Sequence, residues 1–182
     1  VVDIGVLVAE VGQLLDIQAR ARDLTLDVGT GCDPTEVLAD RQRLTQVLIN
    51  LVSNAIKYNR PGGRVEVTWR RDGVRVRIEV ADTGAGISSV DLERLFTPFE
   101  RLGRAESVEG TGIGLALSRQ LVHAMDGRIT VESEGDLVHI DTARSTNGVV
   151  TFTLPALVAG TYDLTFSYDG DTVLLDLSLD IP

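Results

Sequence analysis

The stretch Asn50-Leu51-Val52-Ser53-Asn54-Ala55-Ile56-Lys57-Tyr58 closes a segment of helical periodicity over residues 41–58. Apolar residues recur in that segment at three- and four-residue spacing: Leu44, Val47, Leu48, Leu51, Val52 and Ala55. Asp40 stands where a helix N-cap is expected, and Pro61-Gly62-Gly63 follows the last turn. The pattern predicts a long amphipathic helix with one buried face.

A polar face lies beside this apolar stripe. Asn50, Asn54 and Lys57 are at positions i, i+4 and i+7, so they share one side of the helix. Amide oxygens are suitable ligands for a hydrated Mg²⁺ ion, and a lysine ammonium attracts phosphate oxygens. An ordinary solvated face has the same pattern, so the helix alone leaves both interpretations open.

The surrounding elements indicate the fold class. Alternating apolar residues on either side of Asp72-Gly73 predict a β-hairpin. The other predicted elements are helices over 2–22, 89–95 and 112–125, and strands over 24–28 and 128–132. Helices and strands are mixed without a regular strand–helix–strand repeat. We therefore predict an α+β fold, a two-layer α/β sandwich of about three helices on one mixed, largely antiparallel sheet, with extra C-terminal β strands.

A second motif, Asp82-Thr83-Gly84-Ala85-Gly86-Ile87, directly follows a strong strand pattern. Glycines allow the backbone to pass close to a flat ligand, and an aspartate can accept a hydrogen bond from an exocyclic amine such as that of adenine. Most Asp-x-Gly-x-Gly strings are simple turns, so this motif alone is weak.

A third motif, Gly110-Thr111-Gly112-Ile113-Gly114-Leu115, opens the helix predicted over 112–125. Free N–H groups at a helix N-terminus favour phosphate, and glycines permit its close approach. A dinucleotide-binding fingerprint would require a strand immediately before the glycines, whereas residues 101–109 are polar. The Rossmann interpretation is therefore rejected.

The order of these motifs is more specific than any one of them. The Asn-rich helix, the hairpin, the Asp82 loop, the segment Phe96-Thr97-Pro98-Phe99-Glu100-Arg101 and the Gly-x-Gly helix resemble the four boxes of the histidine-kinase catalytic domain. That domain belongs to the ATPase superfamily of type II topoisomerases, heat-shock chaperones and mismatch-repair proteins. The resemblance covers about residues 2–134. It implies binding of ATP and Mg²⁺ and transfer of the γ-phosphate to a histidine on a separate dimerisation domain, in two-component signalling.

The resemblance also implies a role for individual residues. Asn50, Lys57 and Arg101 form the implied catalytic set, and Asn54 is the implied Mg²⁺ ligand. The implied nucleotide contacts are Asn50, Asn54, Lys57, Tyr58, Asp82, Gly84, Gly86, Ile87, Phe99, Gly110, Thr111, Gly112, Gly114 and Leu115. Phe96 and Phe99 are expected to anchor a mobile lid over residues 97–109, whose length is typical of a functional loop.

Two other functions remain as alternatives. Topoisomerase-like ATPases have a water-activating glutamate four residues before the metal-binding asparagine, and here that position is Asn50, which has no basic lone pair. Hydrolysis is therefore disfavoured relative to phosphoryl transfer. The other alternative is a nucleotide-regulated binding module that holds ATP without transferring phosphate.

Composition limits the partners. The net charge of −10 argues against nucleic acid, and no apolar run reaches the length of a membrane span, so we expect no membrane contact by this segment. A cytoplasmic location is expected, as a free protein or as the cytosolic part of a membrane-bound sensor. Neither His123 nor His139 lies on a helical hairpin. The phosphoacceptor and dimerisation domain is therefore expected to be separate, with a response regulator as an indirect partner.

The C-terminal residues have a different character. Alternating apolar residues and Asp-Gly and Asn-Gly turns resemble part of a bacterial immunoglobulin-like domain. We place a catalytic domain at 1–155, with an insertion at about 136–147, and a β-strand tail at 156–182. A natural fusion, a chimera and strands that extend the kinase sheet all fit this pattern. Because two isolated hairpin strands are marginal in water, we expect the tail to add strands to the kinase sheet.

Overall fold

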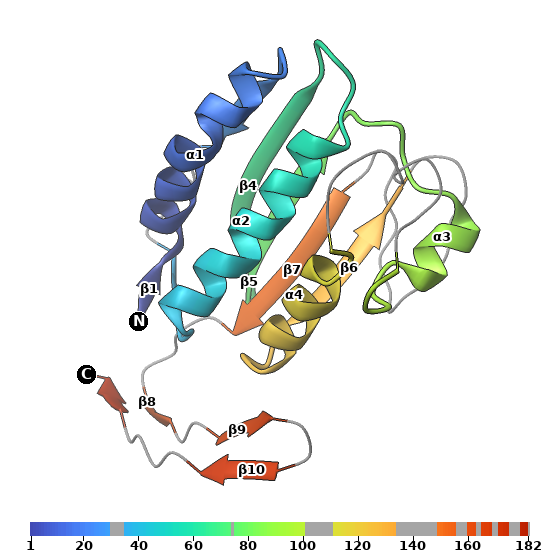
Figure 1. The fold of residues 1–182 in the computed structure, drawn as a ribbon. Helices are drawn as coiled ribbons and strands as arrows, with labels where there is room; N and C mark the ends of the chain where they lie inside the picture. Colours follow the sequence, from blue (N-terminus) through green and yellow to red (C-terminus); the bar gives the residue numbers. More distant parts are fainter. Residues whose placement is uncertain are drawn as a thin grey trace.

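A computed structural model describes residues 1–29, 35–73, 75–100, 111–133 and 149–155, and four short strands between 160 and 181. From residue 149 onward the description covers the backbone. The elements form two layers, with helices on one face of a five-stranded sheet (Figure 1). This confirms the predicted α+β sandwich.

The sheet has the strand order β2-β4-β5-β7-β6. Its strands are β2 (Thr25–Val28), β4 (Arg64–Asp72), β5 (Arg75–Asp82), β7 (Val149–Pro155) and β6 (Arg128–Glu132). β2 and β4 run parallel, and the other neighbouring pairs are antiparallel. The sheet is therefore mixed and largely antiparallel, as predicted. β7 lies between β5 and β6, although it follows both in sequence.

Three long helices cover one face of the sheet: α1 (Ile4–Arg20), α2 (Arg41–Lys57) and α4 (Gly114–His123). α1 packs on β2 and β4, α2 on β4 and β5, and α4 on β6 (Figure 1). The short helix α3 (Ser89–Arg94) lies on the β6 side of the molecule. Within the described ranges, no helix is long and apolar enough to cross a membrane.

The core lies between α2 and the central strands. The apolar stripe predicted for α2 is buried, with Leu44 and Leu48 fully inaccessible to solvent. Facing it, alternate residues of β4 and β5 are buried: Val65, Val67, Val76, Ile78 and Val80. The Asp40 carboxylate accepts a hydrogen bond from the Arg43 N–H at 3.1 Å, which confirms the predicted N-cap of α2.

Several predicted boundaries move by one or two residues. α1 begins two residues later than predicted, because Asp3 caps it by accepting from the Val6 N–H at 3.0 Å. α4 is shorter than predicted at both ends. A short antiparallel ladder between β1 (Val2–Asp3) and β3 (Glu36–Val37) was not predicted, because two-residue strands show no alternation.

The expectation that the tail extends the sheet is wrong. β9 (Thr165–Tyr168) pairs with β10 (Asp171–Leu174), and β8 (Gly160–Tyr162) pairs with β11 (Leu179–Ile181). None of these described strands joins the five-stranded sheet. Alternation defines the two faces of a strand but does not select its partner. Here the described tail strands pair with one another. The predicted insertion at 136–147 lies outside the described residues.

Candidate functional site

The polar face of α2 contacts α4 through Asn50. Asn54 and Lys57 are half-buried, and the Lys57 ammonium lies 5.3 Å from the centroid of the Tyr58 ring. Within the described part of the chain, the Asn54 carboxamide has no hydrogen-bond partner. It therefore remains available to an external ligand, unlike Asn50, which is engaged with α4.

Asn50 contacts α4 through both ends of its side-chain amide. Its Nδ2 donates a hydrogen bond to the Ser118 Oγ at 2.8 Å. A Cβ atom added to Gly114 would lie 2.2 Å from the Asn50 Oδ1, which is far inside van der Waals contact. The glycine at 114 therefore allows the first turn of α4 to approach Asn50, in addition to any role toward phosphate.

The N-terminus of α4 lies beside this contact. Ile113 occupies its N-cap position and makes no side-chain capping hydrogen bond. The first N–H groups of a helix have no intrahelical partners, and the helix dipole adds a partial positive charge there. Thr111 is exposed and Gly112 half-buried just before the helix, while Leu115 packs against the core. This end of α4 is suited to an anion.

Asp82 lies at the other end of the site, at the end of β5. Its Oδ1 accepts a hydrogen bond from the Gly84 N–H at 2.7 Å. Burial raises the pKa of the Asp82 carboxyl above its ordinary value, and the Gly84 hydrogen bond partly opposes that rise. A half-buried carboxylate with acceptor capacity left over is suited to a donor such as an exocyclic amine.

The Asp82 loop is fixed to the end of α2. A Cβ at Gly84 would lie 2.9 Å from the Tyr58 carbonyl oxygen and 2.7 Å from the Asp82 Oδ1. Gly86 adopts a positive φ of 73°, and the Ile87 N–H donates to the buried Ser133 Oγ at 2.6 Å. The loop therefore has a defined position relative to Lys57 and Tyr58.

The segment around the two phenylalanines joins the start of α4. Phe96 is buried, and the Arg119 guanidinium of α4 lies 5.1 Å from its ring centroid. Phe99 is 76% exposed, and its N–H donates to the Gly112 carbonyl at 3.1 Å. Phe96 is thus fixed against α4, whereas Phe99 is exposed and adopts a positive φ of 65°. Their expected role as anchors of a mobile lid stays a prediction.

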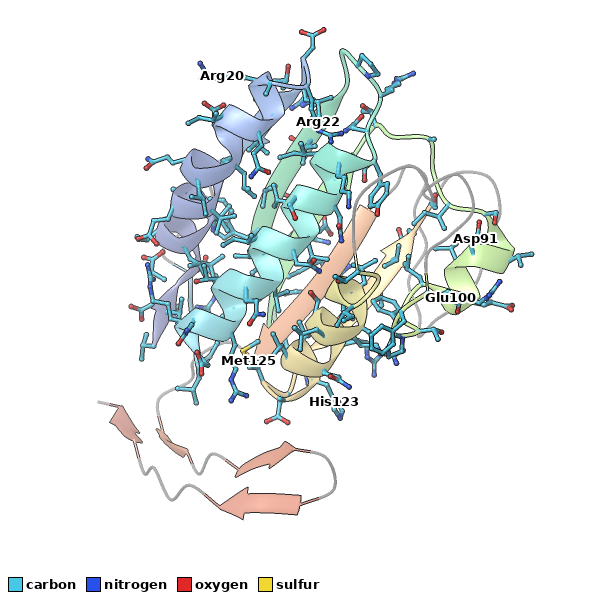
Figure 2. The ribbon with its side chains drawn as sticks, in the orientation of Figure 1. Arg20, Arg22, Asp91, Glu100, His123 and Met125 are labelled. Atoms are coloured by element: carbon cyan, nitrogen blue, oxygen red, sulfur yellow. The ribbon has the colours of Figure 1, made fainter. Side chains whose placement is uncertain are left out.

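The structure therefore brings most of the predicted residues to one side of the molecule. α2 contacts α4 at Asn50, and the residue that follows α2, Tyr58, contacts the Asp82 loop at Gly84. Arg101, Gly110 and residues 101–109 of the predicted lid lie outside the described residues. Figure 2 shows His123 at the C-terminal end of α4, away from Gly114, and the side chain is exposed.

Sequence reasoning missed two buried serines. Ser118 is 2% exposed and Ser133 is 4% exposed, and each accepts a hydrogen bond from a predicted site residue. Ser118 is four residues after Gly114, so both lie on one face of α4. In the sequence, that spacing is the one indication that Ser118 belongs to the site, because its partner Asn50 is distant in sequence.

The two-layer fold, the uncapped glycine-rich helix start and the half-buried Asp82 carboxylate together suit a bound nucleotide. A model of the family described as histidine kinase-, DNA gyrase B-, and HSP90-like ATPase matches residues 39–158. The chain belongs to this family. The relatives described next place it with the histidine-kinase catalytic domains.

Similar proteins include kinases of known structure. DivJ, a histidine protein kinase of Caulobacter vibrioides, is 51% identical over 100 residues, which are 54% of this chain and 17% of DivJ. The nucleotide-free catalytic domain of histidine kinase ThkA has a TM-score of 0.69 and 28% identity, over 85% of this chain and 93% of that domain. Full-length ShkA in complex with AMPPNP has a TM-score of 0.69 and 32% identity, over 87% of this chain and 31% of that chain. This chain thus spans less than a third of DivJ and ShkA.

Proposed function

We propose that this domain binds ATP with Mg²⁺ and transfers the γ-phosphate to a histidine on a separate helical dimerisation domain, with a response regulator as the later acceptor. The observation that carries the proposal is the combination of three groups: the Asn54 carboxamide, which has no hydrogen-bond partner among the described residues, the uncapped α4 N-terminus and the Asp82 carboxylate. These three groups match the metal, phosphate and adenine ends of ATP. The AMPPNP complex of ShkA is consistent with such a ligand.

Each residue has a separable task. The Asp82 carboxylate accepts a hydrogen bond from the adenine amine, and Gly84 holds that carboxylate in place. The Asn54 amide oxygen is a hard ligand that suits Mg²⁺, which supplies charge neutralisation at the phosphates. The Lys57 ammonium and the free N–H groups of α4 attract the phosphate oxygens. In such a site, rate acceleration comes mainly from positioning and charge.

The hydrolase alternative gains no support from Asn50. Its amide cannot accept a proton from water as a carboxylate can, and its Nδ2 already donates to Ser118. A nucleotide-regulated binding module that does not transfer phosphate remains the second candidate, because the same site geometry would serve it.

One experiment separates these candidates. The chain is incubated with labelled ATP and Mg²⁺, and a helical hairpin carrying a phosphoacceptor histidine is supplied separately. Label on the hairpin supports the proposal, whereas nucleotide binding without label on any hairpin supports the binding module. Release of phosphate without a hairpin would instead support hydrolysis.

The Asp82→Asn variant tests the adenine end. Loss of a hydrogen bond to a charged acceptor costs about 1.5–3 kcal/mol, so affinity for ATP is expected to fall roughly 10- to 150-fold. Asp72→Asn is the control, because Asp72 is a partly exposed aspartate at the opposite end of the β4–β5 hairpin. Unchanged ATP affinity of Asp82→Asn in calorimetry would remove this residue from the site.

A further inference from the structure

The contact between Asn50 and Ser118 joins two elements that the proposed site uses for different purposes. α2 carries the metal-side residue Asn54, one helical turn after Asn50. α4 provides the phosphate-side N–H groups, one turn before Ser118. The hydrogen bond between Asn50 and Ser118 therefore lies one turn away from each functional group and spans the two helices.

The surroundings of this bond leave it few alternatives. Ser118 is 2% exposed, so water cannot readily replace the Asn50 amide as its partner. Gly114 brings its backbone close to the same amide, with Asn50 Oδ1 2.2 Å from the position of an added Cβ. The amide is thus confined between Ser118 and Gly114, and the spacing of α2 and α4 is set at their polar faces.

We propose that Ser118 is a positioning residue of the nucleotide site: through Asn50 it holds the phosphate-binding end of α4 in register with the metal-binding face of α2. This inference rests on the proposed binding of ATP with Mg²⁺. It adds a residue that contacts neither the adenine nor the phosphates. Because the register exists before the ligand arrives, binding does not have to order the two helices relative to each other.

The position of Ser118 predicts a selective effect. Loss of its hydroxyl should weaken the binding of the triphosphate and the metal, because the groups that bind them come from both helices. Adenosine should be unaffected, because the Asp82 carboxylate is held by Gly84 at the C-terminal end of α2, beside Tyr58, and has no bond to Ser118 or Asn50 among the described residues. A residue that served only stability would affect both ligands equally or neither.

The test compares Ser118→Ala with the parent chain by calorimetry, using ATP with Mg²⁺ and adenosine as separate ligands. We expect about a 2- to 13-fold loss of affinity for ATP with Mg²⁺, the range for one neutral hydrogen bond, and unchanged affinity for adenosine. Ser53→Ala is the matched control, because within the described residues the Ser53 hydroxyl bonds only to the Asn50 main-chain carbonyl. It should leave both affinities unchanged.

A double-variant cycle identifies the partner. If Ser118 acts through Asn50, the loss caused by Ser118→Ala should disappear when Asn50 is already alanine. Ser118→Thr, which retains the hydroxyl, should bind ATP with Mg²⁺ as tightly as the parent chain. Ser118→Cys replaces Ser118→Ala if the alanine variant does not fold. Equal losses for both ligands, no loss, or additive losses with Asn50→Ala would overturn the inference. A parent chain that binds neither ligand would refute the proposed function itself, and the inference with it.

Discussion

Gly84→Ala tests whether the Asp82 loop is shaped by contact with the end of α2. The backbone of Gly84 has no positive φ, so an alanine there is not strained by its own conformation. Its Cβ would instead lie 2.7 Å from the Asp82 Oδ1, 2.9 Å from the Tyr58 carbonyl oxygen and 3.6 Å from the Asn59 Cα. The carbonyl belongs to the end of a packed helix and cannot rotate away, so the loop itself must move.

The size of the effect follows from these contacts. Forcing a methyl group into a closely packed site typically costs about 1–3 kcal/mol of stability. Moving the loop also breaks the hydrogen bond from the Gly84 N–H to the Asp82 carboxylate, a bond to a charged group worth about 1.5–3 kcal/mol. We therefore expect a folded but destabilised variant, with affinity for adenosine and ATP reduced at least about tenfold because the Asp82 carboxylate is displaced.

The assay is urea denaturation for stability and calorimetry for both ligands. Gly73→Ala is the control: Gly73 lies at the far tip of the hairpin with a φ of 62°, and nothing is within 4 Å of its added Cβ. That change should cost about 1–2 kcal/mol through backbone conformation alone, with no effect on binding. Normal adenosine affinity in Gly84→Ala, or an equal loss in Gly73→Ala, would refute the reasoning.

Three further predictions concern Asp82, Asn54 and the C-terminal tail. Burial raises the pKa of Asp82, so the folded state holds its proton more tightly than the unfolded state. The resulting stabilisation is complete at low pH and is lost as pH rises through the folded pKa. Adenosine affinity should change in the opposite direction and rise with pH, because the ionised carboxylate is the acceptor. Both trends should be absent from Asp82→Asn in titrations of stability and binding against pH, and their persistence would assign them to another group. Asn54→Ala should weaken ATP binding in Mg²⁺ more than in EDTA, and equal losses would exclude the metal role. Truncation after Pro155 removes no strand of the five-stranded sheet, so an unchanged melting temperature is expected and a clear fall would show that the tail supports the domain.

Much of the fold could be predicted because short stretches of sequence determine its helices and strands. The stripe of α2 and the alternation of β4 and β5 are repeated within short windows, and each repeat selects one buried face. The place of β7 between β5 and β6 has no such local cause. Its partners are determined by long-range pairing, which alternation alone does not encode. The same limit explains the wrong expectation for residues 156–182.

The candidate site was predictable to the level of motifs but not of contacts. Asp82 and Asn54 could be named because their residue types and neighbours suit adenine and Mg²⁺. The bond between Asn50 and Ser118 joins residues 68 positions apart, and it depends on how two helices pack. The glycines were assigned to close approach of a ligand, whereas Gly114 also makes room for a protein amide. A glycine pattern indicates that another group comes close to the backbone, but it does not show whether that group is a ligand or a protein side chain.

The central position of β7 has a consequence for the order of folding. Among the described strands, β6 is hydrogen-bonded only to β7, so these five strands cannot form one sheet until residues 149–155 are in place. Until then β5 presents an unpaired edge, on a strand whose other side is already paired with β4. Open edges of this kind promote pairing with other chains. A nascent or circularly permuted chain that delays β7 should therefore aggregate more readily than one in which residues 149–155 are available early.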